Sequence, residues 1–205
     1  SAARLSEILV KVRALIAALG IRKEEAEFEL KKGLSDIAST TKKLSEELNT
    51  VLEELKKSQE LILKNESVKQ ELEILKEINV PLEYFTSYKS LAYFTGYVKD
   101  AIVLNEEISK LTKNFMLLHS GVKKRSFIVL FADARIKEKA QSVLQKNSFS
   151  QVNFSNIANL KGTALINLKK IEEDNAKYGR KIEELNKRIE ALKNEHKEFL
   201  LASEM

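Results

Sequence analysis

Two of the groups of adjacent acidic side chains in this 205-residue sequence are the first candidates for acid–base chemistry. Glu106 and Glu107 form one group, and Glu172, Glu173 and Asp174 form the other. Such chemistry needs two carboxyl groups that face one another, one of them kept protonated by apolar surroundings. Neighbouring residues on a helix point in different directions, and no apolar environment is evident around either group. We therefore interpret both groups as solvated helix faces.

Metal-binding and nucleophilic residues are scarce. The sequence has no cysteine and only two histidines, His119 and His196, which are far apart in the chain. These counts exclude disulfides, thiolate metal sites and cysteine nucleophiles, and they disfavour a zinc site or a histidine-based triad. Gly96 and Gly162 stand alone, outside any phosphate-binding glycine motif. We expect no catalytic residue, metal, cofactor or small-molecule substrate, and hence no enzyme.

A seven-residue hydrophobic repeat runs from Leu168 to Phe199. Its apolar residues recur at alternating steps of three and four, and the same spacing occurs upstream between Leu30 and Ile62. So narrow an apolar stripe cannot be buried by one helix alone, and two such stripes predict an antiparallel two-helix coiled coil. The predicted seam includes Leu44, Leu48, Val51, Leu55, Ile171, Tyr178, Ile182, Leu185, Ile189 and Leu192.

The helical parts have recognisable ends. Heptad spacing predicts a first helix over Arg4–Leu19 that closes near Gly20, and a longer one from about Arg22 to Ile78. Asn79-Val80-Pro81 ends the longer helix, because a residue before proline is forced out of helical geometry. Thr163 is predicted to cap the returning helix. No run approaches the roughly 20 apolar residues of a membrane span.

The segment between the long helices reads as alternating strands and helices. Strands are predicted at 91–98, 115–119, 126–131 and 151–154, the third one central because it is apolar on both faces. Helices are predicted at 101–114, with Asp100 as its cap, and at 134–146. Gly96 is expected to mark a bulge or a close approach. The order is βαββαβ, a ferredoxin-like lobe in an α+β fold, with predicted domains 1–78, 79–160 and 161–205.

The net charge of +5 belongs to this lobe. Between Asn79 and Leu160 eleven Lys and Arg stand against six Asp and Glu, whereas the rest of the chain has 24 of each. The excess is a mild signal for an acidic partner.

The same lobe order is also that of the RNA-recognition module, and the stretch Lys124–Phe131 faintly resembles that module's basic-aromatic strand. Aliphatic residues fill the intervening positions, so Phe127 and Phe131 are better interpreted as core residues. RNA binding remains the alternative function.

Four stretches carry a family resemblance. The first two are Arg4–Arg13, at the start of the first helix, and Leu91–Val98, which ends in Gly96-Tyr97-Val98. The third is Phe127–Phe131 followed by a helix and Asn147-Ser148-Phe149, with Ser148 where the family often has glycine. The fourth is Gly162-Thr163-Ala164 ahead of the second heptad region, with alanine replacing proline. In this order and spacing, over nearly the whole chain, they resemble the soluble N-terminal region of subunit I, or subunit a, of archaeal and bacterial V-type (A-type) ATPases.

The resemblance implies a structural function. In that family a long antiparallel helical pair joins two α/β lobes, and this chain is expected to hold the helical pair and the distal lobe only. The first strands of the proximal lobe would lie before Arg4, and the rest of that lobe, followed by the membrane domain with its ion path, would lie after Met205. The implied role is a non-catalytic stator part of a proton- or sodium-translocating rotary ATPase, at the cytoplasmic face of the membrane. Its expected partners are the peripheral-stalk subunits E and G, with other subunits of the ATPase. Because the lobe is basic, we expect Lys123, Lys124 and Arg125 to contact acidic stalk helices.

Overall fold

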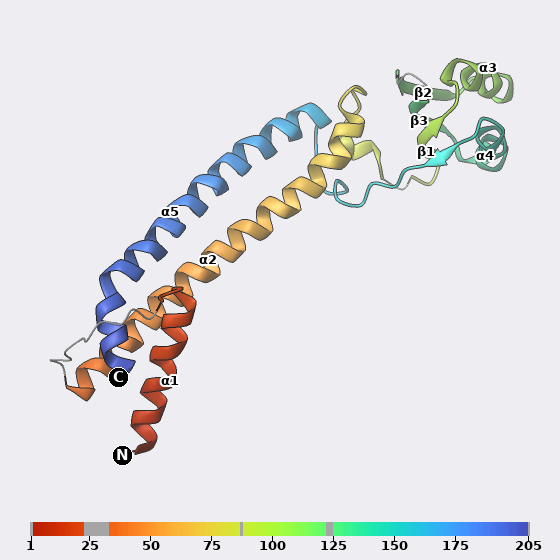
Figure 1. Cartoon of the computed structure of the whole chain (residues 1–205). Coiled ribbons are helices and arrows are strands. Elements are labelled where there is room, and N and C mark those ends of the chain that lie inside the picture. Colours follow the sequence, from red (N-terminus) through yellow and green to blue (C-terminus); the bar gives the residue numbers. More distant parts are fainter. Residues whose placement is uncertain (1, 23–32, 87, 122–124, 205) are drawn as a thin grey trace. The chain divides into compact units, whose positions relative to one another are not determined.

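The computed structural model describes residues 2–22, 33–86, 88–121 and 125–204 (Figure 1). It is a mixed α+β fold, in which helices accompany one antiparallel sheet. Contacts divide the chain into two compact units, Ser1–Leu63 with Asn175–Met205, and Lys64–Asp174. The two long helices, α2 (Leu34–Leu75) and α5 (Ala164–Glu204), contribute to both units. The three domains proposed from the sequence stay a prediction.

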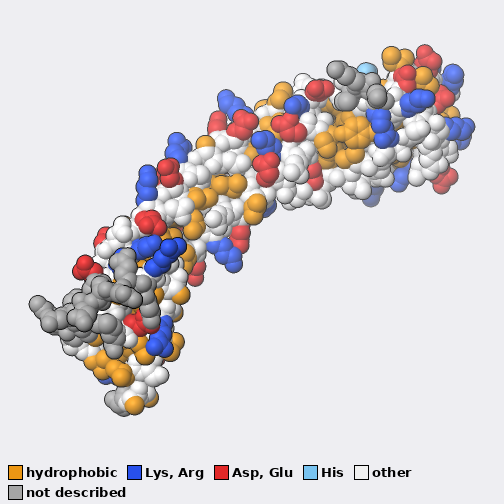
Figure 2. Space-filling view, viewed as in Figure 1, with side chains coloured by type: hydrophobic (Ala, Val, Ile, Leu, Met, Phe, Trp, Pro, Cys, Tyr) orange, Lys and Arg blue, Asp and Glu red, His pale blue; other side chains and the backbone are white. Residues whose placement is uncertain are grey.

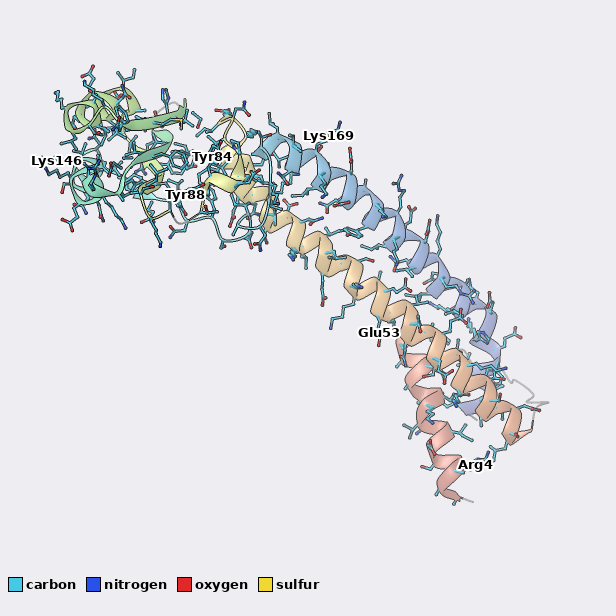
Figure 3. All side chains as sticks on the ribbon, turned by 180° about the vertical axis from the view of Figure 1, so that it is seen from behind. Arg4, Glu53, Tyr84, Tyr88, Lys146 and Lys169 are labelled. Atoms are coloured by element: carbon cyan, nitrogen blue, oxygen red, sulfur yellow. The ribbon has the colours of Figure 1, made fainter. Side chains whose placement is uncertain are left out.

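The first unit is helical, and three helices share its core. These are α1 (Ala2–Ala18), the first part of α2 and the last part of α5. Charged side chains such as Glu53 on α2 point into solvent (Figure 3). The buried members of the core are Val12, Leu15, Ile16, Leu19, Ile21, Leu44, Leu48, Leu192, Leu200 and Leu201.

Helix α1 ends as its sequence predicts. Gly20 has φ +61° and donates its N–H to the carbonyl of Ala17 at 3.1 Å, and the Ile21 N–H reaches the carbonyl of Ile16 at 3.0 Å. This pair of bonds is a Schellman motif, which favours glycine because a side chain is strained at positive φ. The predicted start of the next helix at Arg22 is wrong. Arg22 and Gly33 are not helical, α2 begins at Leu34, and residues 23–32 lie outside the described part.

The second unit is built on a four-stranded antiparallel sheet in the order β2-β3-β1-β4. Its strands are β1 (Leu91–Val98), β2 (Phe115–Ser120), β3 (Ser126–Asp133) and β4 (Ser150–Gln151). Strand β3 is central and its six middle residues are buried, as the sequence predicts. The remaining elements are α3 (Ala101–Leu111), α4 (Lys137–Lys146) and the short 3-10 helices η1 (Leu82–Tyr84) and η2 (Ala134–Ile136).

Both faces of the sheet are covered by parts of this unit. Helices α3 and α4 pack on one face, where Leu104, Ile108 and Leu144 are fully buried. The other face packs against the end of α2, the start of α5 and the segments that join them to the sheet. Its central side chains include Phe127, Val129 and Phe131 together with Leu72, Leu75, Ile157 and Leu168.

Local polar contacts set several boundaries in the second unit. An Asp100 carboxylate oxygen accepts the N–H groups of Ile102 at 2.8 Å and Val103 at 3.2 Å, so the predicted cap of α3 is confirmed. Helix α3 stops at Leu111 rather than at 114, since Thr112 is already extended. The last strand is also shorter than predicted, because β4 ends at Gln151. Among the helices that the structure describes, none is long and apolar enough to cross a membrane.

Candidate partner-binding site

The basic turn predicted as the contact is only partly described. Lys123 and Lys124 fall outside the described residues. Arg125 is exposed and immediately precedes β3, and its Nη2 donates a hydrogen bond to the carbonyl oxygen of Ser148 at 3.1 Å. This bond holds the guanidinium beside the end of α4, where part of its donor fork stays open to solvent. The contact role of the turn stays a prediction.

The predicted seam positions lie inward on their helices. Leu44, Leu48, Val51, Ile171 and Leu192 are buried. The first unit brings Leu44, Leu48 and Leu192 into one cluster, with Ile189 packed against it, whereas Ile171 belongs to the core of the second unit. The half-buried positions are Leu55, Tyr178, Ile182, Leu185 and Ile189. Pairing as a coiled coil stays a prediction.

Ion pairs tie the facing helices of the first unit. Lys181 Nζ lies 2.8 Å from a Glu54 carboxylate oxygen, and the Arg188 guanidinium donates to Glu47. The Lys181 ammonium lowers the pKa of Glu54, first through its hydrogen bond and then through its charge. These groups are exposed, so the pairs set register more than they add stability.

The two acidic groups have no catalytic geometry. A Glu107 carboxylate oxygen accepts a hydrogen bond from Nδ2 of Asn147 at 2.6 Å, and this bond links α3 to the end of α4. Glu106 is exposed. Glu172 and Glu173 are exposed on α5. In the part of the chain that the structure describes, no three His, Asp or Glu side chains are grouped to hold a metal ion.

The sheet face that an RNA-recognition module would use is buried here. Phe127 is 1% exposed and Phe131 is 7% exposed. The Phe127 ring lies 6.1 Å from the ring of Phe154, and the Phe131 ring 6.2 Å from that of Phe85. Bases stack on aromatic rings that are open to solvent. Neither ring can serve as a stacking platform in this arrangement.

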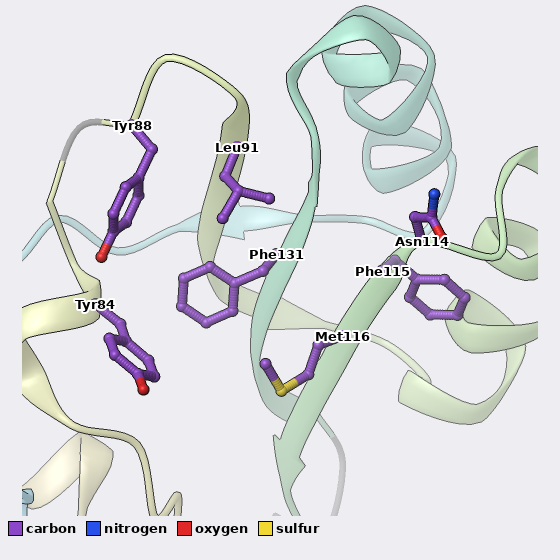
Figure 4. Close-up of a pocket in the computed structure, with 7 residues that line it drawn as sticks. All are labelled: Tyr84, Tyr88, Leu91, Asn114, Phe115, Met116 and Phe131. Atoms are coloured by element: carbon purple, nitrogen blue, oxygen red, sulfur yellow. The ribbon is translucent and has the colours of Figure 1, made fainter.

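An apolar cavity of about 390 Å³ in the second unit was not predicted from the sequence. Figure 4 shows Tyr84 and Tyr88 on one side of it, with Met116 and Phe131 across from them. Tyr84 is 48% exposed and Met116 is 46% exposed, so the cavity opens to solvent. The remaining lining residues are Leu91, Asn114 and Phe115. The feature of the sequence that could have indicated this cavity is the pair Tyr84 and Tyr88, spaced four apart in the short segment that joins α2 to β1.

Comparison with known proteins gives a significant sequence relationship. The chain is 23% identical over 159 residues to A-type ATP synthase subunit I of Archaeoglobus fulgidus, a match that covers 72% of this chain. The matched stretch spans 22% of the length of that relative. No known protein-family profile matches. The structure has a TM-score of 0.43 and 14% identity to the cytoplasmic N-terminal domain of subunit I, homolog of subunit a, of V-ATPase, covering 98% of this chain and 66% of that one.

Proposed function

Because the chain is a homologue of A-type ATP synthase subunit I, we propose that it forms a non-catalytic stator part of a rotary V/A-type ATPase. The sequence match to subunit I, together with the order of elements, carries this proposal. In the proposed role the chain belongs to the cytoplasmic part of an integral membrane subunit. It would link a membrane domain outside this chain to the peripheral stalks and resist the torque of the rotor.

Long helices support a stator role on mechanical grounds. Helix α2 has 42 residues and α5 has 41, so each is about 60 Å long at about 1.5 Å per residue. Within the first unit their inward residues share a core and are bridged by Lys181–Glu54 and Arg188–Glu47. We propose that the pair is an antiparallel coiled coil, which is stiff along its axis and able to bend.

The second unit supports the idea of a distal lobe. Its strand order β2-β3-β1-β4, with antiparallel neighbours and α3 and α4 on one face, supports the ferredoxin-like lobe that we propose from the βαββαβ order. The proposed partners are the E and G subunits of the peripheral stalks. The proposed contact is the basic turn Lys123, Lys124 and Arg125, since basic residues attract acidic helices.

Titration calorimetry of this chain against the purified E–G heterodimer from the same source tests the proposal. We expect saturable binding that weakens at least tenfold when Lys123, Lys124 and Arg125 are all changed to Glu. A matched control changes Lys137, Lys139 and Lys146, which are exposed on α4 of the same unit, to Glu. The control removes the same charge from another surface and should bind like the unaltered chain.

The outcomes separate the two parts of the proposal. Equal weakening by both triple variants would show a response to net charge and would refute the turn as the contact. Absence of binding by a chain whose circular dichroism shows it folded would refute the stator role.

A further inference from the structure

Strand β2 forms an outer edge of the sheet without the usual protection of an edge. It pairs with β3 over six consecutive residues without a bulge, and no described segment pairs with its other side. Its sequence, Phe-Met-Leu-Leu-His-Ser, contains no proline, lysine or acidic residue. Native proteins usually block such edges with charges, prolines or bulges, because unpaired N–H and C=O groups attract another strand. An unblocked apolar edge offers a place where another strand can add to the sheet.

The apolar cavity begins beside this edge. Met116 of β2 projects into it together with Phe131 of the neighbouring strand, and Leu91, 42% exposed, closes one side (Figure 4). In a strand added to an edge, alternate side chains point to the same face of the sheet. One large apolar side chain of an added strand would therefore enter the cavity while the backbone pairs with β2.

The charged residues next to β2 in the sequence are all basic. From residue 110 to residue 125 the sequence has no acidic residue. Lys89 and Lys113, next to the cavity residues Tyr88 and Asn114, are exposed and form no ion pair with any other described residue. Figure 2 shows a hydrophobic patch in this unit, with Lys or Arg as well as Asp or Glu side chains around it. The basic residues of this stretch are Lys110, Lys113, Lys123, Lys124 and Arg125.

The basic residues near β2 indicate which kind of strand could pair with its free edge. Pairing of β2 with β2 of a second copy would bring basic residues close to basic residues, because both ends of the strand carry them. Like charges brought together oppose such an association. A strand with acidic residues beside an apolar anchor would match both the charge and the cavity.

We propose that β2 and the adjoining cavity bind an extended segment of a partner protein, with acidic residues flanking a large apolar one, by adding a strand to the sheet. Alternate residues of β2 direct their N–H and C=O groups away from β3, so the edge offers backbone bonds that do not depend on the partner's sequence. The anchor in the cavity and the acidic flanks supply selectivity. This inference is independent of the stator function.

Synthetic eight-residue peptides and the intact 205-residue chain provide the test. One peptide carries a central Phe between alternating Val and Glu, a second has Lys in place of Glu, and a third keeps the Phe and has proline at the two consecutive positions that follow it. We expect the first to bind in fluorescence anisotropy and to shift the amide resonances of Phe115–Ser120. The second and third should bind at least tenfold more weakly, since one opposes the basic flanks and the other lacks the backbone donor.

Two variants and a control localise the binding. Met116→Lys introduces a charge into the cavity and Lys113→Glu reverses a flank, and each should weaken the acidic peptide at least fivefold. Leu165→Lys alters a residue of the same unit that is 60% exposed and lies outside the cavity lining, and should change nothing. Circular dichroism checks that each variant is folded. The proposal is overturned if the acidic peptide fails to bind at millimolar concentration, if proline is tolerated, or if Met116→Lys binds normally.

Discussion

Replacing Gly96 by alanine should destabilise the sheet of the second unit strongly. Gly96 lies in β1, between Ile128 of β3 and Gln151 of β4. A Cβ atom placed on it would lie 2.3 Å from the carbonyl oxygen of Ser150 and 2.6 Å from a ring carbon of Phe149. Carbon and oxygen atoms normally come no closer than about 3.3 Å, so the two strands would have to separate by about 1 Å.

The cost follows from what has to move. Added methyl groups in packed sites cost about 1–3 kcal/mol, and here a backbone carbonyl and a packed ring both stand in the way. Strand β4 pairs with β1 through Gly96–Gln151 and Tyr97–Ser150, and the Val152 N–H continues the contact to the Thr95 carbonyl at 2.8 Å, so the displacement falls within a short ladder. We expect the free energy of unfolding to fall by about 3 kcal/mol. This figure already allows for the smaller backbone entropy that alanine loses on folding compared with glycine. For a unit of this size that lowers the melting temperature by roughly 10–20 °C.

Tyrosine near-ultraviolet circular dichroism is the suitable probe. Four of the five tyrosines, Tyr84, Tyr88, Tyr93 and Tyr97, lie in the second unit, whereas the far-ultraviolet signal is dominated by the long helices. Gly179→Ala is the matched control, because no atom lies within 4 Å of the added Cβ. Gly179 lies inside α5, where alanine is favoured by about 1 kcal/mol. The reasoning fails if Gly96→Ala melts like the unaltered chain, or if both substitutions shift stability the same way.

Three further substitutions test local features of the second unit. Ser148→Gly should raise stability by about 0.5–1 kcal/mol in urea unfolding, because Ser148 has φ +56°, which glycine adopts without strain. Asp100→Ala should cost about 1 kcal/mol in the same assay, since it removes the cap of α3. Arg135 lowers the pKa of Asp133 to about 2 through its side-chain and backbone hydrogen bonds. That contribution is present above the ordinary aspartate pKa of about 4 and is lost as the pH falls from 4 to 2, so Asp133→Asn should flatten the dependence of melting temperature on pH in that window.

Each of these has its own contrary result. A Ser148→Gly chain that is less stable would mean that the serine side chain contributes a contact that outweighs its strain. An Asp100→Ala chain as stable as Asp100→Asn would show that the cap bonds contribute nothing. For Asp133, an unchanged slope between pH 4 and pH 2 would refute the Arg135 pairing as the cause of the lowered pKa.

Features fixed by short-range chemistry could be predicted from the sequence. The bounds of β1, the cap at Asp100 and the close at Gly20 depend on a few neighbouring residues. The close approach at Gly96 was also predicted, because a glycine among aromatic and β-branched residues leaves space for a neighbouring backbone where any side chain would fill it. The alternative expectation of a bulge there is wrong, since β1 pairs with β3 without interruption.

Errors occur where a periodic pattern continued past a break. The apolar spacing between Leu30 and Leu44 suggested one helix from Arg22, yet Gly33 is the residue before α2 and accepts the N–H groups of Asp36 and Ile37. The spacing of apolar residues indicates which face of a helix is apolar, but it does not show at which residue the helix begins. The last strand failed for a related reason. Val152 and Phe154 alternate as in a strand and are half-buried. Val152 still donates its N–H to the carbonyl of Thr95 on β1 at 2.8 Å, but the regular strand ends at Gln151, and the Val152 and Phe154 side chains pack on the second face of the sheet.

The candidate docking edge depends on strand order, and for that reason pattern alone could not reveal it. The apolar run Phe115–Leu118 fits an inner strand as well as an edge strand. Only the pairing of β1 with both β3 and β4 leaves β2 outermost. The cavity likewise requires the segment holding Tyr84 and Tyr88 to meet residues of three strands, a long-range arrangement. The sequence did show that the charged residues next to β2 are all basic. This charge suggests an acidic partner strand only once the structure shows that β2 is an edge strand.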